Sequence, residues 1–156
     1  MGDDGFGPAV IAHITGKMPQ TADVAFLDAG TSARDLLFDM LFSQPKTKNL
    51  IIIDAVDQKG RRAGEIFELD PGLMPENKIA DYSVHQFPGN NLLTELSRTA
   101  RIKVVLYAVQ VDGIPDCICP GLSRAVKAAV PVMCRKIALA VSRLNPGGQP
   151  KGNLLC

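Results

Sequence analysis

Two stretches of the chain are almost continuously apolar over the length of a single β-strand. Residues 50–55 read LIIIDA, and residues 103–111 read KVVLYAVQV. Runs of this kind are typical of strands that are covered by helices on both faces. We therefore predict two buried strands and expect the first to lie centrally in its sheet. Asp54 ends that strand, which places a carboxylate where open α/β sheets bind their ligands.

Apolar side chains at helical spacing predict four helices around these strands. Their apolar positions are Val10, Ile11 and Ile14; Leu36, Leu37, Met40 and Leu41; Leu92, Leu93 and Leu96; and Val126, Val130, Cys134, Ile137 and Val141. Ser123 is the expected cap of the last helix.

Two further strands are predicted, at residues 21–26 and 65–69, and the first of them leads into Asp28. The linker between residues 56 and 64 is too short and too rich in turn formers for a parallel crossover. The strand at 65–69 should therefore run antiparallel to its neighbour. The expected fold class is α/β, with a small, mostly parallel but mixed sheet.

Length and composition narrow the class of protein. The chain has 156 residues, a net charge of +1 and four cysteines, at positions 117, 119, 134 and 156. We expect one domain at residues 1–145 with a flexible tail at 146–156, no nucleic-acid partner and no insertion into a membrane. So few cysteines, clustered towards one end, do not form a disulfide framework, which favours a reducing, cytoplasmic setting.

Several acids and one histidine are candidates for chemistry. Asp3 and Asp4 lie in a glycine-rich start, Asp28 and Asp54 follow predicted strands, and His85 lies in a predicted loop. Each acid alone is also explained as a helix cap or turn former, and a lone loop histidine is more often a bystander than a ligand. Together, carboxylates and an imidazole at one sheet edge suit a divalent transition metal.

Other kinds of site find little support. Cys117 and Cys119 are separated by one residue, which is not a usual zinc spacing, and Cys134 falls on the apolar stripe of a helix. The other histidine, His13, lies near the apolar face of the first predicted helix and is interpreted as a surface or core-edge residue. The sequence contains no phosphate-binding loop and no nucleophile-elbow serine.

Four blocks of the sequence, in this order, resemble the maturation endopeptidases of nickel-iron hydrogenases. They are GDDGFGP at 2–8, LDAGT at 27–31, LIIIDAV at 50–56 and SVHQ at 83–86. The resemblance implies a three-layer α/β/α sandwich. It also implies a protease that removes the C-terminal extension of a hydrogenase large-subunit precursor after nickel insertion.

By this resemblance the metal-contacting residues would be Asp4, Asp54 and His85, which would also be the catalytic set. Asp28 would be a supporting acid. The nickel would be carried by the substrate and read by the protease as a signal that the site is filled. Cleavage would then use either a metal-polarised carbonyl or a metal-activated water.

The chain departs from the family pattern in two places. The family begins with a strand and a glycine-asparagine turn, and both are missing before the GDDGFGP block. We expect either a start upstream of Met1 or repair of the unpaired sheet edge by self-association. The second departure is Asp4, because many relatives have glutamate there. Residues 117–123 resemble the subtype that serves archaeal deazaflavin-reducing hydrogenases.

Two alternative functions remain at this point. One is a non-catalytic hydrogenase accessory protein that binds nickel or the precursor without cutting it. The other is a small hydrolase with unrelated substrates on the same architecture, since a fold does not determine a function.

Overall fold

The structure, a computed structural model, describes residues 2–18, 21, 23–42, 47–70, 90–113 and 121–144. Three sequence predictions lie outside these residues. They concern the loop that carries His85, the Cys117 and Cys119 segment, and the tail at 146–156.

The described sheet has three strands in the order β1-β3-β2. β1 (Asn49–Val56) runs parallel to β3 (Lys103–Gln110), with Asn49 opposite Lys103 and Val56 opposite Gln110. β2 (Ile66–Leu69) pairs with β3 in the antiparallel direction. The predicted mixed sheet and the antiparallel direction of this strand are therefore confirmed.

The expectation that the 50–55 strand is central was wrong. β3 holds the middle position, and all its residues from Leu106 onward are buried. Leu50 to Asp54 of β1 are only half-buried, because in the described part of the chain β1 pairs with β3 alone. An unbroken aliphatic run indicates that helices cover both faces of the strand, but it does not indicate how many strands lie beside it.

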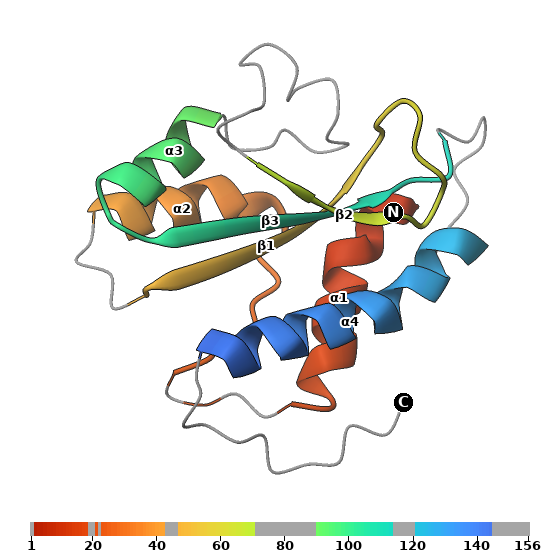
Figure 1. The fold of residues 1–156 in the computed structure, drawn as a ribbon, viewed down its shortest axis with the longest axis horizontal. Helices are drawn as coiled ribbons and strands as arrows, with labels where there is room; N and C mark the ends of the chain where they lie inside the picture. Colours follow the sequence, from red (N-terminus) through yellow and green to blue (C-terminus); the bar gives the residue numbers. More distant parts are fainter. Residues whose placement is uncertain are drawn as a thin grey trace.

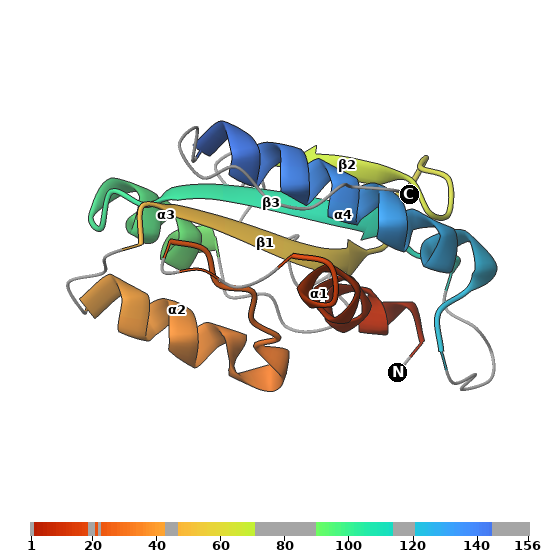
Figure 2. The same cartoon turned by 90° about the horizontal axis from the view of Figure 1, so that it is seen from below.

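Helices cover both faces of the sheet, as Figure 1 shows. α1 (Phe6–Thr15) and α4 (Arg124–Leu144) lie on one face and pack against Val105 and Val109 of β3. α2 (Ala33–Phe42) and α3 (Asn90–Arg98) lie on the other face, where Val104 joins their apolar cluster. Figure 2 shows β1 and β3 running side by side between the helical layers. The predicted three-layer α/β/α sandwich is confirmed.

Two features of α4 agree with the sequence. Ser123 caps the helix, because its Oγ accepts a hydrogen bond from the backbone N–H of Val126 at 3.3 Å. Cys134 is buried in the core shared with α1, and its Sγ lies 3.7 Å from the carbonyl oxygen of Val10. Burial raises the pKa of this thiol, which is consistent with a core residue rather than a reactive one.

The strand predicted at residues 21–26 does not form in the part of it that the structure describes, which is residue 21 and residues 23–26. Thr21 and Val24 make an isolated bridge, and the following residues pass as irregular chain towards α2 (Figure 1). A strand is stable only beside a neighbour that completes its hydrogen bonds. Among the described residues no strand precedes β1 in the chain, so this segment has no such neighbour.

Candidate active site

Asp54 lies two residues before the carboxyl end of β1. The hydrogen bonds from Lys103 N–H to Lys48 O and from Val111 N–H to Val56 O show that even-numbered residues direct their backbone groups towards β3. The odd-numbered Ala55 therefore directs its N–H towards the opposite edge of β1. The Oδ1 atom of Asp54 accepts that N–H at 2.8 Å, which places the carboxylate at the outer edge of the strand.

The start of α1 approaches the same edge. A Cβ atom added to Gly7 would lie 3.2 Å from the carbonyl oxygen of Ile53, tighter than most real contacts of this kind. Ile53 is odd-numbered, so its carbonyl also points away from β3. Phe6, which is fully buried in the core, anchors this end of the helix. Glycine at position 7 thus permits the backbone of α1 to lie directly against β1.

Asp4 sits immediately before this contact. It belongs to η1 (Asp3–Gly5), a single 3-10 turn that packs against β1 and leads into α1. Asp4 is half-buried, and its Oδ1 atom is buried. The turn that carries Asp4 and the carboxylate of Asp54 therefore meet at the same stretch of the β1 edge.

Asp3 has a role that the local pattern did not predict. A helix cap was one of the two explanations open for Asp3 and Asp4, but neither η1 nor α1 has a side-chain cap. Instead, the carboxylate of Asp3 accepts the N–H of Asp112 at 2.9 Å and the N–H of Ser123 at 2.6 Å. Asp3 therefore accepts a hydrogen bond at the N-terminal end of α4 rather than at the start of α1.

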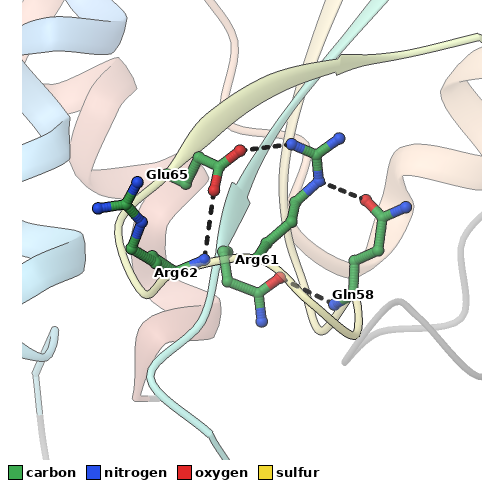
Figure 3. Close-up of polar contacts among 5 residues, drawn as sticks. Gln58, Arg61, Arg62 and Glu65 are labelled. Carbon is green, nitrogen blue, oxygen red and sulfur yellow. Dashed lines mark hydrogen bonds and ion pairs between the residues drawn. The ribbon is translucent and has the colours of Figure 1, made fainter.

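A polar network holds the segment that follows Asp54. Gln110, a buried polar side chain, donates from Nε2 to Asp57 Oδ1 and accepts the N–H of Gln58 at Oε1, both at 2.9 Å. Arg61 donates to Gln58 Oε1 at 2.7 Å and pairs with Glu65 (Figure 3). Within the apolar run of β3, glutamine was the one signal that could have identified this network.

The turn closed by this network is also stabilised electrostatically. Hydrogen bonds from the backbone of Arg62 and the side chain of Arg61 lower the pKa of Glu65. Stability from this lowered pKa is present above the ordinary value of 4.5 and is lost as the pH falls through the folded-state pKa. The guanidinium of Arg61 also stacks 3.7 Å above the ring centre of Phe67, which holds this side chain against β2.

The other expected site residues are placed differently. Asp28 is exposed, and its Oδ1 accepts the N–H of Gly30 at 3.1 Å within its own turn. His85 lies outside the described residues, and within those residues no three metal-ligating side chains form a cluster. The structure thus brings together the elements that carry Asp4 and Asp54. It leaves the third expected member untested.

No helix in the described part of the chain is long and apolar enough to cross a membrane.

Comparisons with known proteins agree with this architecture. The profile of the hydrogenase maturation protease family (HycI) matches residues 8–140. The hydrogenase maturating endopeptidase HybD from Escherichia coli is 27% identical, with a TM-score of 0.70 over 93% of this chain and 86% of that one. An E. coli endopeptidase solved in solution is 26% identical, with a TM-score of 0.71 over 91% of this chain and 85% of that one.

A third similar structure supports the fold alone. The [NiFe] hydrogenase maturation protease HycI from Thermococcus kodakarensis KOD1 is 20% identical, with a TM-score of 0.70 over 90% of this chain and 85% of that one. A search of curated proteins returned no significant match. The family profile nevertheless spans most of the chain. The chain therefore belongs to the hydrogenase maturation protease family.

Proposed function

We propose that this hydrogenase maturation endopeptidase recognises the nickel in its large-subunit precursor through Asp4, Asp54 and His85. Nickel is then part of the substrate, and the protease removes the C-terminal extension only from a precursor that is already loaded. The subtype that we propose is the one serving archaeal deazaflavin-reducing hydrogenases, because residues 117–123 resemble that version of the loop. We expect the reaction to take place in the cytoplasm.

One observation supports this proposal most directly. Gly7 of α1 and the carboxylate of Asp54 lie at the same edge of β1. Gly7 follows Asp4 by three residues, and Asp54 directly follows Ile53, whose carbonyl oxygen Gly7 approaches. Both acids are half-buried, so neither is an ordinary solvated surface charge. A metal ion brought by the substrate would place a positive charge beside these two carboxylates.

The chemistry of the proposed set suits nickel. Carboxylate oxygens and an imidazole nitrogen are acceptable ligands for a divalent transition metal. Three ligands from the protease would hold the ion in place while the substrate supplies the rest of its coordination. The bound ion could then polarise the carbonyl of the bond to be cut or activate a water molecule. For Asp28 we propose a supporting role near the reaction, as an orienting or general-base group.

His85 provides the first test. We expect His85→Ala to slow cleavage of the nickel-loaded precursor at least tenfold, because one of three proposed ligands is lost. The rate is measured by mass spectrometry of the precursor over time, with circular dichroism as a check that the variant is folded.

His13→Ala is the matched control, because His13 is a half-buried histidine on α1 with no role in the proposed set. We expect it to cleave at the wild-type rate. Equal rates for the His85 variant and wild type would remove His85 from the site.

A further inference from the structure

The carboxylate of Asp3 joins three parts of the molecule that are remote in sequence. One oxygen, Oδ2, accepts the N–H of Asp112, two residues beyond the end of β3. The other oxygen, Oδ1, accepts the N–H of Ser123, the capping residue of α4. A single side chain in the first turn therefore clamps both ends of the segment that connects β3 to α4.

Both hydrogen bonds to the Asp3 carboxylate belong to a strong class of hydrogen bond. Hydrogen bonds between an ionised carboxylate and backbone N–H groups are shorter and roughly twice as strong as neutral ones. The negative charge also lies at the N-terminal end of α4, a helix of 21 residues, where the helix dipole favours an anion. Each oxygen serves a different donor, so the position of the carboxylate is determined from two directions.

The clamp acts on the residue next to it. Asp3 and Asp4 are consecutive in η1, and the hydrogen bond from Gly5 N–H to Gly2 O at 3.0 Å closes that turn. In a turn of only three residues the neighbouring backbone moves together, so fixing the position of Asp3 also fixes the backbone of Asp4 relative to β1. We infer that Asp3 is a positioning residue, which holds Asp4 in place by binding the backbone N–H groups of Asp112 and Ser123. This inference rests on the proposed role of Asp4.

A matched set of variants separates this role from general stability. Asp3→Ala removes both acceptors. Asp3→Asn keeps one oxygen and turns an N–H donor towards the other amide, so it retains part of the clamp at most. Asp112→Pro removes one donor from the opposite side, whereas Asp112→Ala keeps that backbone N–H and deletes only an exposed side chain.

We expect Asp3→Ala and Asp112→Pro to lower kcat for cleavage of the nickel-loaded precursor between about 10-fold and 100-fold, with a much smaller change in KM. Asp3→Asn should fall between them and the wild type, and Asp112→Ala should match the wild type. The expected signature is a much larger change in kcat than in KM, because the change displaces one of the three groups that contact the nickel and leaves the rest of the precursor-binding surface untouched.

Amide hydrogen exchange gives a second readout that does not depend on activity. The N–H groups of Asp112 and Ser123 should exchange slowly in the wild type and in Asp112→Ala, and the Ser123 N–H should lose protection in Asp3→Ala. Wild-type kcat in Asp3→Ala and Asp112→Pro, or a KM effect alone, would overturn the inference.

Asp54→Asn, assayed in parallel, keeps the two questions apart. If Asp54→Asn loses cleavage while the Asp3 and Asp112 variants retain it, only the positioning role fails. If Asp54→Asn also retains cleavage, the proposed function of the site fails.

Discussion

Asp54→Asn is expected to slow cleavage of the nickel-loaded precursor about 100-fold or more while leaving the fold intact. Metal polarisation supplies several kcal/mol of transition-state stabilisation, and each 1.36 kcal/mol is worth a factor of ten in rate. Asparagine keeps an oxygen that can accept the N–H of Ala55, as the carboxylate does at 2.8 Å. The variant therefore removes the negative charge and preserves the local hydrogen bond.

Asp57→Asn is the control for this experiment. It neutralises an exposed carboxylate three residues further along and retains an oxygen for Gln110 Nε2, which lies 2.9 Å from Asp57 Oδ1. Cleavage rates for both variants are followed by mass spectrometry, and their melting temperatures are compared with the wild type. If the two variants were slowed equally, the effect would come from general charge at this edge and not from Asp54.

Gly64→Ala is expected to be the most destabilising small substitution outside the core. Gly64 has a φ of +78°, and a Cβ atom there would lie 2.6 Å from the carbonyl oxygen of Ala125 at the start of α4. The left-handed backbone alone costs about 1–2 kcal/mol for a residue with a Cβ. The clash is with backbone, which cannot turn aside, so we expect a total loss of about 3 kcal/mol. For a chain of this size that is a fall of roughly 6–12 °C in Tm.

Gly60→Ala separates the two causes. Gly60 has a φ of +87°, but nothing lies within 4 Å of a Cβ added there. It should therefore show the cost of backbone strain alone, roughly 2–8 °C in Tm. Thermal unfolding followed by circular dichroism measures both variants. Equal shifts for Gly60→Ala and Gly64→Ala would mean that the approach to α4 is less tight than the structure indicates.

The sequence predicted those parts of the fold that depend on local pattern. The two aliphatic runs became β1 and β3, helical spacing located the four α-helices of the described residues, and the short linker after Asp54 indicated an antiparallel β2. Each of these features is recorded in the period or length of a single segment.

The misplaced elements depended on neighbours that local pattern does not record. Residues 21–26 have the composition of a strand but lack a strand to pair with in the described sheet, and β1 proved to be its outer strand. Strand order is a property of the whole sheet and leaves no trace within one strand.

The same distinction applies to the site. Asp54 was singled out as a candidate because it interrupts an apolar run, and Asp4 because of its motif. The role of Asp3 was missed, since its partners are 109 and 120 residues away in the sequence. Gln110 was also missed, although a polar residue in a buried strand requires partners and is therefore a signal in its own right.

On the proposed function, this chain cleaves a precursor whose nickel it contacts through Asp4, Asp54 and His85. The most direct test incubates the purified protein with the same large-subunit precursor in nickel-loaded and nickel-free forms, and measures the precursor mass. We expect loss of the C-terminal extension from the loaded form alone. An intact loaded precursor, or equal cleavage of both forms, would contradict it.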